Sequence, residues 1–368
     1  MVVLKNILLD KMLWIAAGAA VISTFVSKPQ LSDINFQTIF SLMSMMILVQ
    51  ILENIGLLQF VSTRLTAKAH NTCQLMTALV LLAFFGSMFI TNDVAILILA
   101  PLFFKIASEI PLSRALTMTM ITIAANLGSS FTPFGNPHNL FLLSHFNLNA
   151  LTFFKMSTPL MLIELVLLIL TTNLLAKPKP INIKVTPFEI NLGSLIVALF
   201  LTIFIFLGIF KIVPIWWTTV AAAILACIID PHILKKVDYT TLLVFVCFFI
   251  AVGNISRFPA VANLISRLVA KPISTYLTSI GFCQLISNVP TTILVAKFTK
   301  HFYALFLGSN IGGLGTLVAS MANLLAYKQY VFFTRKKEAL HFIKISFQVN
   351  LLLLVILGCI GLVLVKLV

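Results

Sequence analysis

The stretch Asn126-Leu-Gly-Ser-Ser-Phe-Thr-Pro-Phe-Gly-Asn-Pro-His-Asn139-Leu140 is repeated in altered form 184 positions later, as Asn310-Ile-Gly-Gly-Leu-Gly-Thr-Leu-Val-Ala-Ser-Met-Ala-Asn323-Leu324. In this register four pairs of small or polar residues are identical, namely Asn126 with Asn310, Gly128 with Gly312, Thr132 with Thr316 and Asn139 with Asn323, in addition to Leu140 with Leu324. These residues are small and polar in a chain that is otherwise apolar. The repeat therefore indicates an internal duplication, and it predicts that the functional chemistry lies in these two stretches.

The composition of the chain determines its class. Of its 368 residues 60% are hydrophobic and 10% are charged, and the mean hydropathy is +1.09. A soluble globule of this size could not shield so much apolar surface from water. We therefore predict an all-α polytopic membrane protein in which one membrane domain fills the chain.

The hydrophobic runs predict the membrane-spanning segments, since a spanning helix needs about 20 apolar residues. Nine runs qualify: 12–27, 35–56, 113–146, 151–175, 190–210, 214–229, 240–256, 301–328 and 340–365. Gly, Pro and Asn interrupt 113–146 and 301–328, so we expect broken helices there. Two further stretches are broken by polar clusters, Thr91-Asn92-Asp93 and Ser287-Asn288-Val289-Pro290. We expect these stretches, 71–106 and 272–299, to form re-entrant hairpins.

The duplication divides the chain into four predicted parts. They are an N-terminal transmembrane helix (1–34), a first repeat (35–175) with hairpin 71–106 and broken helix 113–146, a linker with two connecting spans (176–239), and a second repeat (240–368) with hairpin 272–299 and broken helix 301–328.

The net charge of +15 is spread over short loops, which is typical of topology signals in membrane proteins and not of a nucleic-acid-binding face. A cytoplasmic N-terminus and an outside C-terminus would place sixteen of the 25 basic residues inside: Lys5, Lys11, Arg64, Lys68, Lys105, Arg114, Lys177, Lys179, Lys184, Lys235, Lys236, Lys328, Arg335, Lys336, Lys337 and Lys344. This orientation makes the two repeats antiparallel, that is, inverted. No nucleic-acid partner is expected.

Inverted repeats with paired broken helices are typical of secondary transporters. Non-helical backbone at membrane depth persists only where protein buries it or where it lines a wet cavity. Half-helix C-termini and free carbonyl groups suit a cation, while half-helix N-termini suit an anion. We therefore expect two hairpin tips and two broken helices to form one composite site for a substrate and a coupling ion.

Four motifs resemble those of a known family. Ile90-Thr-Asn-Asp-Val-Ala-Ile-Leu97 resembles the hairpin motif of the citrate transporter-like and ArsB/NhaD permeases in the ion-transporter superfamily, whose relatives include the divalent anion/sodium symporters. Gly128-Ser-Ser-Phe-Thr-Pro-Phe-Gly-Asn-Pro-His-Asn-Leu140 resembles the broken-helix loop of the same family, and Ser287-Asn-Val-Pro290 and Gly308-Ser-Asn-Ile-Gly-Gly313 resemble its second-half counterparts. The resemblance extends from residue 30 to residue 366. It implies a scaffold domain, a moving transport domain and a homodimer.

The resemblance also implies the residues that bind substrate and ion. They are Thr91, Asn92, Asp93, Asn126, Gly128, Thr132 and Asn136 in the first half, and Ser287, Asn288, Asn310, Gly312 and Thr316 in the second half. It implies Na⁺ at Asn92, Asp93 and Gly128, and again at Asn288, Asn310 and Gly312. Both hairpin tips read Ser-Asn-Thr in the dicarboxylate branch, whereas the acidic tip here is closer to the ArsB/NhaD pattern.

Several of these residues have a structural alternative. Asp93 is predicted to hold an ion or proton, because acids within the membrane are costly and usually functional, but it could instead cap a helix. Asn92 and Asn288 could hold the hairpin turns together. Glu164 could relay a proton or form a hydrogen-bonded contact between helices. The five cysteines stand singly and are interpreted as packing residues.

Three functions follow from the sequence. The first is an ion-coupled permease, driven by Na⁺ or H⁺, for a carboxylate or small oxyanion. The second is a Na⁺/H⁺ antiporter of the NhaD kind. The third, a membrane-embedded enzyme or assembly factor, lacks the His-Glu-x-x-His and Gly-x-Ser-x-Gly signatures in this sequence. We predict a transporter of the cell (inner) membrane, with a small anion and the lipid bilayer as partners, no cofactor and no enzymatic activity.

Overall fold

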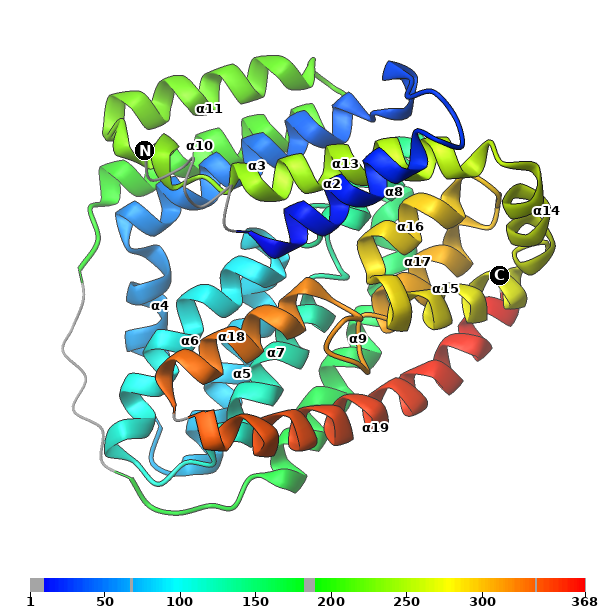
Figure 1. The fold of residues 1–368 in the computed structure, drawn as a ribbon. Helices are drawn as coiled ribbons and strands as arrows, with labels where there is room; N and C mark the ends of the chain where they lie inside the picture. Colours follow the sequence, from blue (N-terminus) through cyan, green and yellow to red (C-terminus); the bar gives the residue numbers. More distant parts are fainter. Residues whose placement is uncertain (1–9, 67–68, 182–188, 335, 368) are drawn as a thin grey trace.

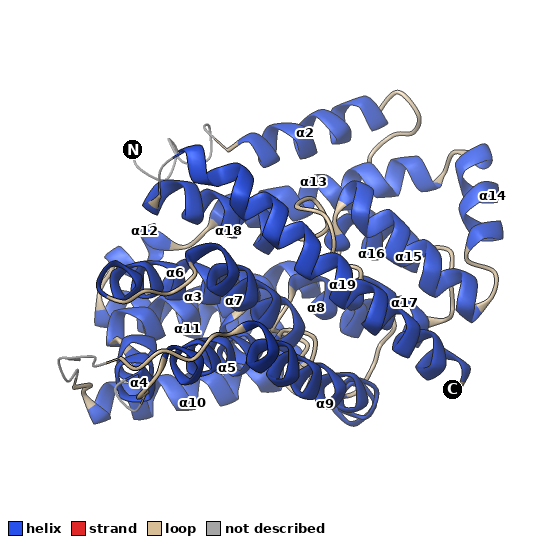
Figure 2. Ribbon diagram, turned by 90° about the horizontal axis from the view of Figure 1, so that it is seen from below, coloured by secondary structure: helices blue, strands red, loops and turns tan. Residues whose placement is uncertain are grey.

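The computed structural model describes residues 10–66, 69–181, 189–334 and 336–367, and every regular element in these ranges is a helix (Figure 1, Figure 2). Of the basic residues used to predict the orientation, Lys5, Lys68, Lys184 and Arg335 lie outside the described ranges.

The helices form two series joined by a connection. The first series, preceded by α2 (Lys11–Ser23) and the 3-10 turn η1 (Leu31–Asp33), is α3 (Phe36–Ile55), α4 (Leu57–Thr66), α5 (Thr72–Ile90), α6 (Asn92–Glu109), α7 (Arg114–Gly128), α8 (Pro137–His145) and α9 (Ala150–Leu175). The connection is α10 (Leu192–Ile209), α11 (Ile215–Ile229) and α12 (His232–Lys236). The second series is α13 (Tyr239–Ser256), α14 (Pro259–Leu268), α15 (Pro272–Ile286), α16 (Asn288–Ala296), α17 (Phe302–Ile311), α18 (Met321–Phe333), the 3-10 turn η2 (Lys336–Glu338) and α19 (Ala339–Lys366).

The two series have the same order of elements. Each has a long helix, a short helix, two helices that meet at one residue, an interrupted helix and a final long helix. The interruptions lie where the sequence predicted broken helices, between α7 and α8 and between α17 and α18. Pro137 and Asn136 explain the restart of the first one, because Pro fits the first helical position and cannot continue an earlier turn.

Six helices of the described chain are long and apolar enough to cross a bilayer: α3, α5, α9, α10, α13 and α19. This agrees with an all-α polytopic membrane protein. The predicted span 12–27 needs correction, because its helix α2 ends at Ser23 and has 13 residues. Such a helix is about 20 Å long, shorter than the hydrocarbon core of about 30 Å. The predicted span 214–229 agrees with α11, whose 15 residues are likewise fewer than the about 20 that a perpendicular span needs.

The helices form an upper and a lower group in Figure 1. There α2, α3, α10, α11 and α13 lie along the upper side, α5, α6, α7, α15, α18 and α19 lie below them, and α14 lies at the right edge. Helix α2 packs on α13, and α3 packs on α10 and α11, while α7 contacts α5, α6, α18 and α19 below.

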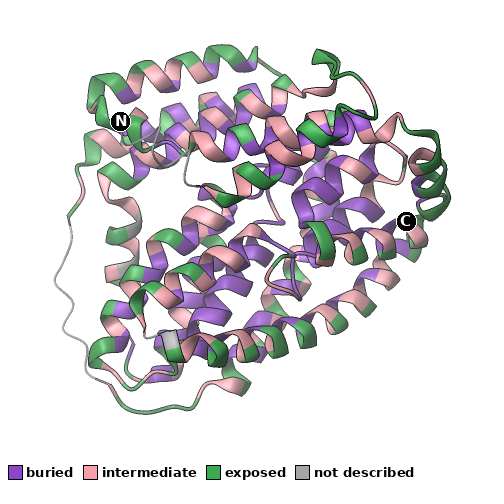
Figure 3. Ribbon diagram, in the orientation of Figure 1, coloured by how far each residue is buried: buried purple, intermediate pink, exposed green. Residues whose placement is uncertain are grey.

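Burial follows this arrangement. The buried residues concentrate on α7, α8, α16 and α17 in the middle of the molecule, and exposed residues follow α10, α11 and α19 at its edges (Figure 3). Many exposed side chains are large and apolar, among them Trp14, Leu174, Phe200 and Trp217. An outer surface of this kind is suited to lipid and not to water.

Candidate functional site

The two helix pairs meet at equivalent, strained residues. Thr91, between α5 and α6, has φ 70° and ψ 150°, and Ser287, between α15 and α16, has φ 73° and ψ 158°. Positive φ is uncommon for residues other than glycine and is concentrated at functional sites. The first residue of each following helix docks on the interrupted helix of its own half. Asn92 N donates to Gly135 O at 3.1 Å, and Asn288 N donates to Ala319 O at 2.9 Å.

The unwound segments 129–136 and 312–320 are also held alike. Thr132 Oγ1 donates to the backbone oxygen of Met88 at 2.6 Å. Its repeat partner, Thr316 Oγ1, donates to the backbone oxygen of Gln284 at 3.3 Å. Each threonine therefore ties its unwound segment to the helix that precedes the junction residue.

Four buried asparagines join the two halves. Asn126 Nδ2 donates to Asn323 Oδ1 at 2.8 Å, and Asn310 Nδ2 donates to Asn139 Oδ1 at 3.0 Å. Asn126 corresponds to Asn310 in the repeat, and Asn139 corresponds to Asn323. The two hydrogen bonds are therefore the same contact with the two halves exchanged. Asn92 Nδ2 connects this quartet to the first junction, donating to Asn126 Oδ1 at 2.9 Å.

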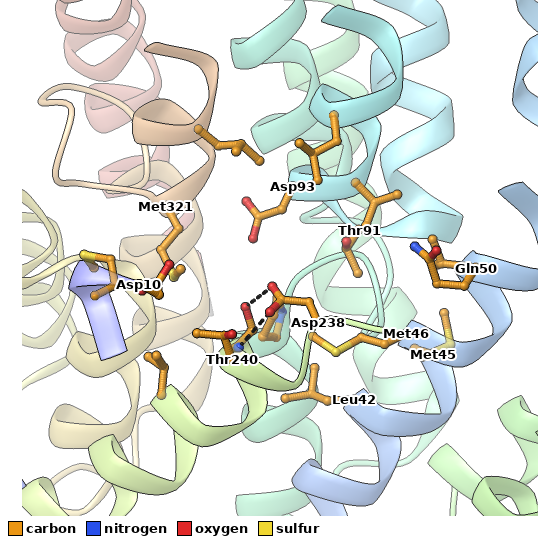
Figure 4. Close-up of a pocket in the computed structure, with 18 of the residues that line it drawn as sticks. Asp10, Leu42, Met45, Met46, Gln50, Thr91, Asp93, Asp238, Thr240 and Met321 are labelled. Carbon is orange, nitrogen blue, oxygen red and sulfur yellow. Dashed lines mark hydrogen bonds between the residues drawn. The ribbon is translucent and has the colours of Figure 1, made fainter. Parts of the chain in front are cut away.

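A cavity of about 240 Å³ lies next to the first junction (Figure 4). The starts of three helices line the cavity, with Asp93 of α6, Pro137 of α8 and Met321 of α18. Helix α3 contributes an apolar wall with Leu42, Met45, Met46 and Val49.

Charged residues line the same cavity. The side chains of Asp93 and Asp238 point into one space in Figure 4, and Asp10, Lys236 and Lys328 complete the charged lining. Asp238 Oδ1 accepts from Thr241 N at 3.1 Å and caps α13. By contrast, Asp93 Oδ1 is buried and has no hydrogen-bond partner among the described residues. Such an oxygen can accept a proton or ligate a hard cation such as Na⁺.

The predicted site residues fall into two groups. Thr91 and Asp93 line the cavity. Asn92, Asn126, Gly128, Thr132 and Asn136 are buried behind it in the first half. Ser287, Asn288, Asn310, Gly312 and Thr316 belong to the second half and are not among the lining residues. The structure thus places the cavity at the junction of α5 and α6 and at α18, whereas the sequence predicted one composite site formed by both hairpin tips and both broken helices. Which of these residues bind ligand stays a prediction.

The binding residues predicted from the sequence do not include several residues that the structure places at the site. Asn139 and Asn323 are identical in the repeat, and this identity was a usable signal for the contact between the halves. Asp10 and Asp238 directly precede hydrophobic runs, where an acidic residue usually caps a helix. Their position on the cavity depends on packing between distant helices and has no sequence signal.

A buried acid lies on the other side of the first unwound segment. Glu164 of α9 is fully buried, and its Oε2 accepts from Ser130 Oγ at 2.7 Å. Its Oε1 has no partner among the described residues. Glu164 therefore ties α9 to the segment that carries the predicted site residues, which agrees with the inter-helix contact and leaves the proton-relay alternative open.

Comparison with known proteins identifies the class. An uncharacterized transporter of Methanocaldococcus jannaschii is 30% identical over 301 residues, which cover 80% of this chain and 81% of that protein. The inner membrane protein YbiR of Escherichia coli is 28% identical over 322 residues, 85% of each chain. A Dictyostelium discoideum transporter named arsB is 33% identical over 126 residues, 34% of this chain and 22% of that protein.

The family assignment rests on a longer match. Residues 1–304 match the family described as citrate transporter. This range includes the first series of helices, the connection and the second helix pair. The resemblance drawn from the sequence motifs is confirmed, and the chain belongs to the citrate transporter family.

Proposed function

We propose that this protein is a secondary active transporter that moves a small carboxylate or oxyanion together with Na⁺ or H⁺ by alternating access. The single observation that carries the proposal is the cavity beside Thr91, where three half-helix starts meet an unpartnered carboxylate oxygen. The match to a family described as citrate transporter supports an organic anion as substrate.

The helix starts supply the attraction for an anion. The helix dipole places partial positive charge at the start of a helix. Several of the first N–H groups here already have partners, such as Asp93 N on Asn92 Oδ1 and Ala322 N on Ser320 Oγ, so the dipoles supply the attraction. Helices α6, α8 and α18 each bring this end to the cavity. Lys236 and Lys328, both exposed, add positive charge at the rim.

Asp93 makes anion binding dependent on a cation. An ionised Asp93 would repel a carboxylate in the same cavity, because the two charges would share a poorly solvated space. A proton or Na⁺ on its free oxygen removes this repulsion. Asn92, Asp93 and the unwound segment that begins after Gly128 would supply oxygen ligands for Na⁺. Binding of the cation thereby favours binding of the anion, which is the requirement for symport.

We also propose that the two series are inverted repeats and that α5–α6 and α15–α16 are re-entrant hairpins. The reciprocal asparagine contacts support this, because a two-fold relation makes residue i of one half contact j of the other and j contact i. The helices within each pair also pack on one another. With the N-terminus in the cytoplasm and the C-terminus outside, the cavity would open to the cytoplasm. The name of the Escherichia coli relative supports the inner membrane. A homodimer remains a further prediction.

The test is transport by the purified protein in proteoliposomes, with imposed Na⁺ or pH gradients and a panel of citrate, succinate, sulfate and arsenite. We expect uptake of one anion class that follows the gradient. Asp93→Asn should lose the gradient dependence and at least about tenfold in rate, a difference of about 1.4 kcal/mol, while remaining folded. Asp230→Asn removes a carboxylate from an exposed loop and serves as control. Gradient-driven uptake that is equal in wild type and Asp93→Asn would refute the role of Asp93.

A Na⁺/H⁺ antiporter is the second candidate, and the acidic lining of the cavity favours it. Asp10, Asp93 and Asp238 all face the same space, which would suit alternate loading of a proton and Na⁺. The same experiment separates the two functions. Proton movement that is driven by Na⁺ without any added anion would support the antiporter and would contradict the anion permease.

A further inference from the structure

The second unwound segment contains a side chain that fills it from within. Gln284 of α15 donates from Nε2 to two backbone oxygens, that of Gly312 at 2.8 Å and that of Leu314 at 2.9 Å. Its Oε1 accepts from Thr316 N at 2.9 Å. Gly315, at φ +105°, makes room for it, because a Cβ there would lie 2.3 Å from Gln284 Oε1.

The first half has no such group at the equivalent place. Gln284 lies three residues before the junction residue Ser287, as Met88 lies three residues before Thr91. The backbones of both residues accept from the repeated threonines, Thr132 and Thr316. The two positions are therefore structurally equivalent. The thioether of Met88 has no hydrogen-bond donor, whereas the amide of Gln284 has two.

The two hairpin tips also differ in charge, because only the first tip carries an acidic residue. The residue two positions after the junction is Asp93 in the first half and Val289 in the second. Carbonyl oxygens that an unwound helix exposes are ligands for a cation. In the first half a carboxylate stands near such a segment and no side-chain donor enters from position 88. In the second half the carboxylate is missing, and an amide donates to the carbonyl groups.

We propose that Gln284 takes the place of a cation in the second half-site, so that only the first half-site binds a coupling ion. The amide supplies the partial positive charge that the carbonyl groups of Gly312 and Leu314 would otherwise receive from Na⁺. This proposal replaces the second Na⁺ site expected at Asn288, Asn310 and Gly312, and it sets the coupling ratio at one cation per transport cycle. The coupling ratio rests on the proposed cation-coupled function. The test of the role of Gln284 measures stability and does not need transport.

Gln284→Met gives the second half the residue of the first half and tests the proposal. In detergent with choline chloride we expect a loss of about 3 °C in Tm, because the three hydrogen bonds of the Gln284 side chain are removed. Replacing choline by Na⁺ should restore most of this loss, since a ligand that binds only the folded state stabilises it. K⁺ at the same concentration should restore less. Gln37→Met is a matched control, because Gln37 Nε2 also donates to a backbone oxygen, that of Gly208 at 3.1 Å. The loss in Tm of Gln37→Met relative to the wild-type protein should be the same in Na⁺ and in choline chloride.

Gln284→Glu provides a second variant if Gln284→Met is poorly folded. It keeps the shape of the side chain but turns a carboxylate oxygen toward two carbonyl oxygens, so its stability should depend on Na⁺ still more strongly. Variants of Gln284 that lose equal stability in Na⁺ and choline would overturn the proposal and leave the amide as a structural link. Equilibrium binding of ²²Na⁺ at two sites per wild-type chain would also overturn it. Wild-type protein that binds no Na⁺ would count against sodium coupling, while sodium rescue of Gln284→Met would still support the role of Gln284.

Discussion

Asn126 shows how a single polar residue can connect a hairpin tip, an unwound helix and the opposite half. Its side-chain oxygen accepts from Asn92 Nδ2 at 2.9 Å and from Ser320 Oγ at 3.1 Å, while its Nδ2 donates to Asn323 at 2.8 Å. The residue is 4% exposed. Within a membrane protein such a residue holds elements together, because its alternative partners are few.

Asn126→Ala should therefore be more destabilising than Asn288→Ala. We expect a loss of about 2 kcal/mol in unfolding free energy for Asn126→Ala, from three hydrogen bonds that each contribute below about 1 kcal/mol in membrane proteins. The side-chain oxygen of Asn288 has a single long contact, from Ser287 Oγ at 3.4 Å. Thermal unfolding of both variants in one detergent measures the difference. Equal losses would show that the quartet does not link the halves.

The sequence predicted which residues belong to this region better than it predicted the contacts that their side chains make. The repeat identified Asn126, Asn310, Thr132 and Thr316. The structure places the two threonines in the unwound segments and the two asparagines in the last turns of α7 and α17, directly before those segments. The repeat could not indicate that Gln284 enters the second segment, because the residue at the equivalent position of the first half is Met88, which differs from it in chemistry. Its side-chain partners lie 28 to 32 residues away.

Helix packing decides how closely the elements of the first half approach one another. Helix α7 contacts α5 at Gly128, where a Cβ would lie 2.0 Å from the backbone oxygen of Phe84. No rotation of a side chain could relieve this clash, since the obstacle is backbone. The glycine therefore fixes the distance between the hairpin helix and the interrupted helix.

Gly128→Ala should lower the unfolding free energy by about 3 kcal/mol or more, as expected for overpacking against backbone. Gly86→Ala on α5 is the matched control, because a Cβ there has nothing within 4 Å. It should retain or slightly raise the Tm, since Ala is preferred to Gly within a helix. Tm and yield of monodisperse protein measure both effects. A Gly128→Ala protein as stable as Gly86→Ala would show that the helices can separate without loss.

Elements were predictable from hydropathy where they are long and apolar. The two breaks were predictable as well, because Gly, Pro and Asn are concentrated there. Helices α4 and α14 were missed, since each has 10 residues and carries polar side chains among the apolar ones. Helix α2 was predicted too long, because hydropathy continues past Ser23 through Phe25 and Val26 although the helix does not.

At the scale of the whole molecule, α13 connects the cavity to an ion-pair cluster. Asp238 at its start lines the cavity, and Arg257 directly after its end pairs with Asp33. The two ends are about 27 Å apart for 18 residues. Asp33 also pairs with Lys297, just after α16, at 3.3 Å. This cluster ties the turn before α3 to the second helix pair on the side opposite the cavity.

The cluster should hold the cavity-open state. Alternating access requires that contacts closing one side are broken when that side opens. Asp33→Asn leaves Arg257 and Lys297 near each other without a carboxylate, which should cost about 1–3 kcal/mol in this state, given that both cations are partly exposed. The population should then shift toward the opposite state.

Labelling of Thr240→Cys, a residue of the cavity lining, measures this shift. A thiol reagent that cannot cross the membrane, added at the cavity side, should react up to about tenfold more slowly when Asp33→Asn is also present, a shift of about 1.4 kcal/mol. The parent chain with its five native cysteines gives the background rate, and Asp230→Asn tests the loss of an unrelated carboxylate. An unchanged rate in Asp33→Asn, with a lowered Tm, would make the cluster a fixed structural contact in both states, because its loss would then cost stability without changing access to the cavity.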